Sequence, residues 1–313
     1  MQTGYMDLRT LETLRAVRSQ GGVTAAAAVL HLTPSAVSQQ LAGLAAEMGV
    51  ALTERVGRGL RLTPAGAALA DAAVDVAVAV ERARAACQGH RDSPVGTVRV
   101  SAFQSAAQLV FPRLLGAVAG WGGVTLECSD EDVALADFPD LTDRFDVVVA
   151  HRPDGAADWP AGVRVVPLFR EPLDVAVSPH HPLAGRVEIS PEELAGEAWI
   201  TVRDGFPVAP VLAAVAARSG AAPRIAHRIN DFAVARAMVA AGHGISLLPR
   251  HTTPASPGVH LLRLTGVPAG RRVEALLRPD RAERRVVTRV VGALTALAAE
   301  IDHRAGRPPD RSG

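Results

Sequence analysis

A helix predicted over residues 34–48 has two chemically different faces, and it constrains the fold more than any other segment. At 100° per residue, its larger apolar side chains fall on one side and its short polar side chains on the other. The two sets are Val37, Leu41, Leu44 and Met48 against Ser35, Ser38 and Gln39. Thr33 can cap this helix, and Pro34 suits its first position. The apolar side needs partner helices, whereas the polar side is either solvated or a binding surface.

Two shorter helices are predicted immediately before this segment. Leucines at helical spacing follow Asp7 and stop at Gly21-Gly22, and an alanine-rich stretch covers residues 23–30. Alanine permits the close helix approach that a helix-turn-helix motif needs. In such a motif the second helix of the pair enters the major groove of DNA. The residues that we expect to contact DNA from it are Thr33, Pro34, Ser35, Ser38, Gln39 and Gln40.

A basic hairpin is predicted after these helices. Residues 52–55 and 60–62 read as two strands joined by Val56-Gly57-Arg58-Gly59, a glycine-bearing turn. The formal net charge of the chain is only +1, so DNA binding requires a local cationic patch. The hairpin supplies one with Arg55, Arg58 and Arg61. We expect it to be the wing of a winged helix, whose guanidiniums contact phosphates or the minor groove.

A longer helix is predicted after Thr63-Pro64. Along it, apolar residues recur at alternating steps of four and three, which is typical of a helix that pairs with another helix. The positions are Leu69, Ala73, Val76, Val80, Ala83 and Cys87. The alternative is that this seam packs on the domain of its own chain.

Residues 11–69 resemble the LysR-type family of transcriptional regulators. The resemblance is carried by the run from Leu30 to Leu41, by Leu52-Thr53-Glu54-Arg55 and by Leu62-Thr63-Pro64-Ala65-Gly66. Gln39 departs from the family pattern, because many members carry arginine there, and Thr53 stands where phenylalanine is common. The resemblance implies a homodimer formed through the linker helix, further assembled as a dimer of dimers. It also implies double-stranded promoter DNA, RNA polymerase and a small-molecule effector as partners.

Strands and helices alternate beyond a polar, turn-rich boundary near residue 92, with one of the helices predicted over residues 132–141, which implies a parallel sheet covered on both faces. The family resemblance extends over this region and implies a periplasmic-binding-protein-like α/β effector domain of two lobes joined by crossing strands. The expected chain is therefore an α plus α/β multidomain protein. Its parts are a winged helix-turn-helix DNA-binding domain (1–63), a linker and dimerisation helix (64–92), an effector-binding domain (93–301; lobe I 93–166 and 269–301, lobe II 167–268) and a disordered tail (302–313).

The effector pocket is expected between the lobes, because ligands of open parallel sheets bind beyond the carboxyl ends of the strands. Polar residues at these ends and at the helix starts beside them are Ser101, Gln104, Ser105, His151, Thr201, Arg203, Asn230 and Asp231. Ser105 and the amides of a helix N-terminus favour an anion, and Arg203 adds positive charge. We therefore hypothesise an anionic metabolite, although each residue singly also fits a cap or a solvated loop.

Two other functions stay open at this stage. Ten histidines and many serines and acids are compatible with a hydrolase or another enzyme built on the α/β domain. However, the chain has no G-x-S-x-G elbow, H-E-x-x-H motif or glycine-rich phosphate loop after a strand. His180-His181 is the most metal-like pair, but between two prolines it is more typical of an exposed turn, so no metal or cofactor is expected. A ligand-independent architectural DNA-binding protein would leave the two-lobed domain without a purpose.

The location of the protein follows from what the sequence lacks. No apolar run reaches the roughly 20 residues that a membrane span needs. Charged residues among the first 18 positions argue against a secretory signal, so we expect a cytoplasmic protein with no membrane partner. Cys87 and Cys128 lack metal-type spacing, and we expect both to be small buried residues rather than parts of a disulfide or zinc site.

Overall fold

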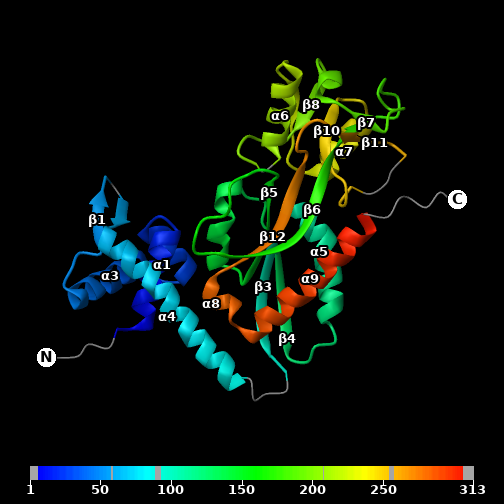
Figure 1. Ribbon diagram of the computed structural model, residues 1–313. Coiled ribbons are helices and arrows are strands. Elements are labelled where there is room, and N and C mark those ends of the chain that lie inside the picture. The colour runs from blue at the N-terminus through cyan, green and yellow to red at the C-terminus, as the bar shows by residue number, and fades with distance from the viewer. Residues whose placement is uncertain (1–5, 58, 89–92, 207, 254–256, 306–313) are drawn as a thin grey trace.

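The computed structural model describes residues 6–57, 59–88, 93–206, 208–253 and 257–305. Its N-terminal part is a group of three helices with a hairpin, from which a long helix leads to the foot of a large sheet domain (Figure 1). These elements are α1 (Leu8–Ser19), α2 (Val23–Leu30), α3 (Pro34–Met48), β1 (Thr53–Val56), β2 (Gly59–Leu62) and α4 (Pro64–Gln88). The winged helix-turn-helix and the linker helix are thus confirmed. Arg58 and residues 89–92, where the predicted linker ends, lie outside the described residues.

The local sequence explains where the first helices begin and end. The Asp7 carboxylate accepts from the amide of Arg9 at 2.9 Å, and the Thr33 hydroxyl accepts from the amide of Ala36 at 3.2 Å, so both residues cap helices. His31 ends α2 with a φ of 55°, a left-handed conformation that turns the chain sharply into α3. The helices then enclose one apolar core that includes Leu11, Leu14, Val17, Ala26, Val37, Leu41, Leu44, Leu52 and Ala70.

The start of α4 is locked against the chain that enters the hairpin. Thr63 donates from its hydroxyl to the carbonyl of Ala51 at 2.7 Å and from its amide to the carbonyl of Leu52 at 3.0 Å. The same hydroxyl accepts from the amide of Gly66 at 3.0 Å, which caps the helix. A Cβ at Gly66 would lie 2.0 Å from the carbonyl oxygen of Leu52, so this close approach requires glycine.

The rest of the chain forms one curled sheet with helices on its faces (Figure 1). Its strands are β3 (Gly96–Ala102), β4 (Val124–Asp130), β5 (Val147–Pro153), β6 (Arg164–Val177), β7 (Glu188–Ile189), β8 (Ala198–Thr201), β9 (Arg224–Arg228), β10 (Ile245–Pro249), β11 (His260–Leu264) and β12 (Gly270–Leu277). Its helices are α5 (Gln104–Val118), α6 (Ala209–Ser219), α7 (Phe232–Ala240), α8 (Pro279–Ala282) and α9 (Arg285–Ala305), with short 3-10 helices η1 (Leu135–Asp137), η2 (Pro139–Asp143) and η3 (Pro191–Leu194).

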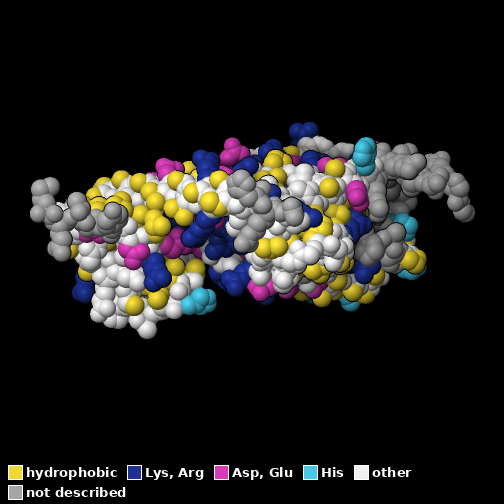
Figure 2. Space-filling view, turned by 90° about the horizontal axis from the view of Figure 1, so that it is seen from below, with side chains coloured by type: hydrophobic (Ala, Val, Ile, Leu, Met, Phe, Trp, Pro, Cys, Tyr) yellow, Lys and Arg dark blue, Asp and Glu magenta, His cyan; other side chains and the backbone are white. Residues whose placement is uncertain are grey.

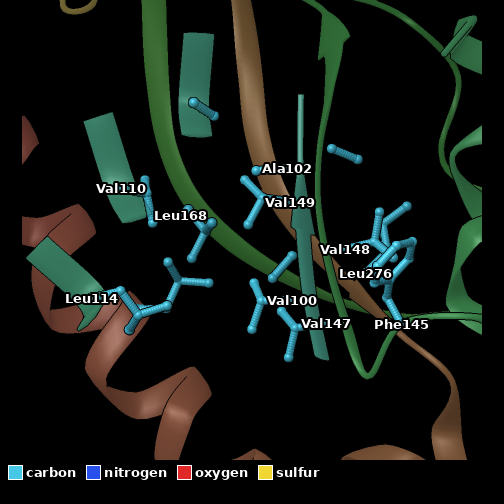
Figure 3. Close-up of a cluster of buried hydrophobic side chains, with 14 of the residues drawn as sticks. Val100, Ala102, Val110, Leu114, Phe145, Val147, Val148, Val149, Leu168 and Leu276 are labelled. Atoms are coloured by element: carbon cyan, nitrogen blue, oxygen red, sulfur yellow. The ribbon is translucent and has the colours of Figure 1, made fainter. Parts of the chain in front are cut away.

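Two lobes share this sheet. The strand order is β4-β3-β5-β12-β6-β10-β8-β9, and β12 runs antiparallel to both of its neighbours. β6 pairs with β12 along residues 164–172 and with β10 along residues 173–176, so it crosses from lobe I into lobe II. Each lobe has its own core. Figure 3 shows part of that of lobe I, where Val100, Val147 and Leu114 meet between the sheet and α5.

The structure differs from the sequence predictions in three places. The helix predicted over residues 132–141 is wrong: two 3-10 helices replace it, because Pro139 has no amide hydrogen to continue a helix. α9 continues to Ala305, beyond the predicted start of the tail at residue 302, and the rest of that predicted tail lies outside the described residues. Cys87 and Cys128 are exposed rather than buried, since the first lies near the far end of α4 and the second on the edge strand β4.

Candidate functional site

The N-terminal part of α3 presents the predicted polar face. Thr33, Pro34, Ser35, Ser38 and Gln39 are all exposed. The hydroxyl of Ser38 donates to the carbonyl of Pro34 at 2.9 Å, which leaves its lone pairs free to accept from a ligand. These five exposed residues lie at the N-cap and in the first two turns of the helix.

Gln40 lies apart from this surface. It is half-buried, and its side-chain oxygen accepts from the hydroxyl of Thr13 on α1 at 2.5 Å. Thr13 is buried, and its single hydroxyl hydrogen is shared between Gln40 and the carbonyl oxygen of Arg9, which lies 3.0 Å from the hydroxyl. Gln40 therefore links α3 to α1, and the structure does not bring it together with the exposed polar residues.

The hairpin separates the two wing arginines that the structure describes. Thr53 pairs with Leu62, Glu54 with Arg61 and Arg55 with Leu60. Because side chains alternate along a strand, Arg61 and Arg55 lie on opposite faces of the hairpin. Both are exposed, and neither forms an ion pair with any residue in the described ranges. The wing is thus a two-sided cationic element rather than a single patch.

The predicted seam of α4 divides between two environments. Ala73 is buried against α1, and Leu69 and Val80 are half-buried. Val76, Ala83 and Cys87 are exposed, and Val76 lines a groove of about 150 Å³ between α1 and α4. Leu8 is 47% exposed at the same groove, so the outer half of the seam leaves apolar surface open.

A buried arginine is the central feature of the cleft between the lobes. Arg271, the second residue of β12, is 1% exposed, and its Nε and Nη2 donate to the Glu171 carboxylate at 2.9 and 2.6 Å. Nη2 also donates to the Ser105 hydroxyl at 2.8 Å. The guanidinium lies over the rings of Phe103 and Phe232, at 4.7 and 5.6 Å from their centroids. Its position is therefore fixed from four sides.

The remaining nitrogen of this guanidinium has no partner. Nη1 of Arg271 is buried and makes no hydrogen bond within the described structure. A buried, unpaired donor on a charged group is costly, so a fixed arginine of this kind is suited to receive an anion. His251 and Thr252 donate their amides to the other oxygen of Glu171, each at 3.1 Å, which holds that carboxylate in place.

Two further buried polar groups without partners in the described ranges accompany Arg271. They are the hydroxyl of Ser101 and Nδ1 of His151. The His151 ring packs 4.1 Å from the ring of Phe103, centroid to centroid. Burial and the charge of Arg271 hold the pKa of His151 well below its usual range, so the ring is neutral. Burial raises the pKa of Asp132, a further cleft residue, although Arg271 opposes this shift.

Gln104 and Asp231 close the cleft from opposite lobes. Gln104 begins α5 in lobe I, and its amide donates to the carboxylate of Asp231 at 2.8 Å. Asp231 caps α7 in lobe II by accepting from the amides of Ala233 and Val234. The hydrogen bond from Gln104 and these two amides lower the pKa of Asp231. The pair is a direct polar link between the lobes.

The predicted effector residues fall into two groups. Gln104, Ser105, His151, Asn230 and Asp231 line two adjoining cavities of about 90 and 20 Å³, while Ser101 is buried on β3 and lines neither of them. Thr201 and Arg203 do not line either cavity, and the side chain of Arg203 is exposed. The backbone amide of Arg203 donates to the side chain of Asn230 at 2.9 Å, so this residue positions the cleft wall through its main chain.

Sequence reasoning missed Arg271. It considered the carboxyl ends of parallel strands, but β12 enters antiparallel, so its first residues lie beside the last residues of β5: Arg271 pairs with Pro153 and Val273 with His151. One signal was available. Side chains two residues apart along a strand lie on the same face, so Arg271 lies on the face of Val273 and Ala275, which are both buried. The apolar wall was also missed; it comprises Phe103, Val202, Phe206, Val208 and Phe232.

Two other classes of site are not found in the described ranges. Among those residues, no group of three or more histidines, cysteines, aspartates and glutamates is arranged to hold a metal ion. No helix in the same ranges combines the length and hydropathy needed to cross a bilayer.

Models of two protein families match the chain. Residues 8–67 match "Bacterial regulatory helix-turn-helix protein, lysR family", and residues 91–299 match "LysR substrate binding domain". Together they cover both parts of the structure.

Individual regulators and solved structures also resemble the chain, at 20–31% sequence identity. The HTH-type transcriptional regulator MetR of Salmonella typhimurium is 31% identical over 199 residues, 61% of this chain, and the match spans only 59% of MetR itself. A full-length OxyR variant from Pseudomonas aeruginosa shares the fold with a TM-score of 0.65, at 20% identity, covering 94% of this chain and 98% of that one. Full-length CbnR complexed with its target DNA has a TM-score of 0.52 at 23% identity, covering 94% and 100%.

Proposed function

The chain belongs to the LysR family of bacterial regulators, and on that premise we propose that it is a DNA-binding transcriptional regulator controlled by an anionic small molecule bound between its lobes. The observation that supports an anionic effector is that Nη1 of Arg271 is buried and has no hydrogen-bond partner among the described residues. Its guanidinium is already held by Glu171 and Ser105, so an anion reaching Nη1 would bind without reordering the arginine.

The surroundings of Arg271 favour a small carboxylate or a similar compact anion. Neutral His151, which lines the cavity, can donate to an anion oxygen from whichever ring nitrogen carries the proton. Phe103 and Phe232 exclude water on the apolar side. Asp132 disfavours a second negative charge and suits a ligand that also carries a hydrogen-bond donor.

The proposed macromolecular partners follow from the winged helix and the linker helix. The exposed start of α3 would enter the major groove of double-stranded promoter DNA, with Arg55, Arg58 and Arg61 of the wing at the phosphates. CbnR, which shares the fold, has been solved with its target DNA. We further propose a homodimer through α4 that assembles as a dimer of dimers, contact with RNA polymerase, and a cytoplasmic location, where the DNA lies. An enzymatic role has no support from the proteins that resemble the chain.

A binding screen tests the effector proposal. We expect compact anions, with acetate, phosphate and sulfate as first probes and larger carboxylates after them, to raise the melting temperature of the full chain and to change its DNA footprint. Arg271→Lys keeps the charge and a contact with Glu171 but loses the second guanidinium arm, so the stabilisation should fall. Arg203→Ala, exposed outside the cavities, is the matched control. Stabilisation by neutral or cationic ligands alone would contradict the proposal.

Affinity and specificity for DNA should separate between the wing and α3. Arg61→Ala should weaken binding to every sequence and reduce the slope of log affinity against log salt by about 1, because it removes one phosphate contact. Gln39→Ala should cost about 1–3 kcal/mol at particular base pairs and relax preference there. Fluorescence anisotropy with an operator and a scrambled duplex at several salt concentrations measures both. Equal, sequence-independent losses from the two variants would contradict these roles.

Dimerisation should depend on the outer half of the α4 seam. Val76→Glu should raise the dimer dissociation constant about tenfold or more, because burying an unpaired carboxylate costs more than the roughly 1.4 kcal/mol that a factor of ten represents. Asp75→Asn is the control, since Asp75 is an exposed neighbour off the seam. Sedimentation velocity over a concentration series measures the effect, and unchanged association of the Val76 variant would rule out this interface.

A further inference from the structure

A buried carboxylate of lobe I is satisfied by the DNA-binding domain. Asp143 ends η2, and its side chain is 2% exposed. It accepts from the guanidinium of Arg15, the hydroxyl of Ser19 and the side-chain amide of Gln20, the last at 2.9 Å. All three donors come from α1 or the residue after it. Within lobe I the nearest cation is Arg278 at 3.6 Å, so the carboxylate depends on the other domain.

In a second contact across the same junction, the cation belongs to lobe I and the carboxylate to α1. Arg278, just after the end of β12, donates to the carboxylate of Glu12 on α1 at 2.9 Å and to that of Asp280 at 2.6 Å. Burial alone would raise the pKa of Glu12, but the hydrogen bond and charge of Arg15, together with Arg278, lower it to about 2. Glu12 is therefore ionised throughout the physiological range of pH.

The junction contains a balanced set of charges. Its cations are Arg15, Arg278, Arg281 and Arg284, and its anions are Glu12, Asp143, Asp146 and Asp280. In Figure 2, arginine and acidic side chains gather at the waist between the two bodies of the molecule. An isolated surface ion pair contributes little, but here four members (Arg15, Asp143, Asp146 and Asp280) are buried and the other four are half-buried, so removal of one member leaves a poorly solvated charge with fewer partners.

We propose that lobe I carries a docking site for α1 of the chain's own DNA-binding domain, centred on Asp143 and Arg278, and that this site fixes the direction in which α3 is presented. The inference goes beyond the proposed function and does not depend on an effector. Only its consequence for DNA rests on that function, and its test uses neither DNA nor effector.

Two backbone segments of lobe I join the docking site to the cleft. β12 begins beside the cleft, where Arg271 lies, and is followed by Arg278 at the junction. The segment that ends at Asp143 begins near Asp132 in the cleft and includes Phe138, whose ring centroid lies 5.7 Å from that of His151. Two separate pieces of backbone, strand β12 and the segment from Asp132 to Asp143, thus connect the cleft to the docking site, and these are the routes by which a shift of lobe I relative to lobe II would reach α1.

Distance measurements between spin labels test the docking site in the full chain. Cys128 is exposed on β4 and serves as one label site; Glu47→Cys on exposed α3 supplies the other, in a Cys87→Ser background. Dilution with unlabelled chain suppresses distances between copies. We expect one narrow distance distribution, which Asp143→Asn and Arg15→Met each broaden. Asp71→Asn removes the exposed ion pair between Asp71 on α4 and Arg18 on α1, away from the docking site, and should leave the distribution narrow.

Two results would overturn the proposal: a broad distribution in the chain with only the labelling substitutions, or distributions for both junction variants as narrow as that reference. Asp143→Asn changes lobe I and Arg15→Met changes α1, so a folding defect in one leaves the other to decide. The circular dichroism of each variant establishes that it is folded. Failure here would leave the proposed function intact, because an undocked DNA-binding domain can still bind DNA and the cleft can still bind an anion.

Discussion

Replacing Arg271 by methionine is expected to lower the free energy of unfolding of the two-lobed domain by about 3–5 kcal/mol, the cost of leaving one partner of a buried ion pair uncompensated. The Glu171 carboxylate is fully buried and would lose both of its contacts with the guanidinium. Urea unfolding followed by tryptophan fluorescence measures this domain specifically, because Trp121, Trp159 and Trp199 all lie in it.

Two companions make this prediction specific. Adding Glu171→Gln to Arg271→Met should restore much of the loss, because a neutral amide needs no counter-charge and its oxygen still accepts from His251 and Thr252. Arg272→Met is the matched control, since its exposed side chain should change stability by less than about 0.5 kcal/mol. A single Arg271 variant as stable as this control would show that the pair does not hold the cleft together.

Replacing Gly66 by alanine is expected to destabilise the winged helix by about 3 kcal/mol, at the upper end of overpacking costs. The new methyl would stand 2.0 Å from the carbonyl oxygen of Leu52, and backbone cannot rotate away as a side chain can. The contact between α4 and the hairpin entrance must open, which moves the wing. We therefore expect a lower-temperature transition by far-ultraviolet circular dichroism and weaker DNA binding.

Gly43 provides the opposite result in the same domain. It lies inside α3 with nothing within 4 Å of the position that a methyl group would take and no left-handed φ, so Gly43→Ala should stabilise the helix by about 0.5–1 kcal/mol. If Gly66→Ala raised the transition temperature as Gly43→Ala does, helix propensity would outweigh the close contact at Gly66 and the packing argument would be wrong.

The winged helix and linker helix were predictable from sequence because their determinants are local. Caps at Asp7 and Thr33, the two-faced helix and the glycine turn all act within a few residues. What local patterns could not reveal was orientation between elements. The pattern placed Gln40 with Gln39, but Thr13 on another helix engages Gln40; the count of wing arginines did not indicate that Arg55 and Arg61 lie on opposite faces.

The sequence predicted where the cleft lies, but it did not predict the buried arginine that gives the cleft its charge. Five of the eight expected residues line it, because strand ends converge there whatever their sequence. Its charge comes from Arg271, 166 positions from the Ser105 hydroxyl that it contacts, and no sequence pattern links residues so far apart. The junction between Arg15 and Asp143 is another such long-range contact, separated by 128 positions.

The shared strand β6 also limits how this chain can change over evolutionary time. Its first residues pair with β12 in lobe I and its last with β10 in lobe II, and its inner side chains enter both cores. One residue inserted near its start would reverse the faces of everything after it. Insertions and deletions should therefore accumulate in the loops on either side of β6 and be absent within it. The alternation of inward and outward side chains along β6 then stays the same in both lobes.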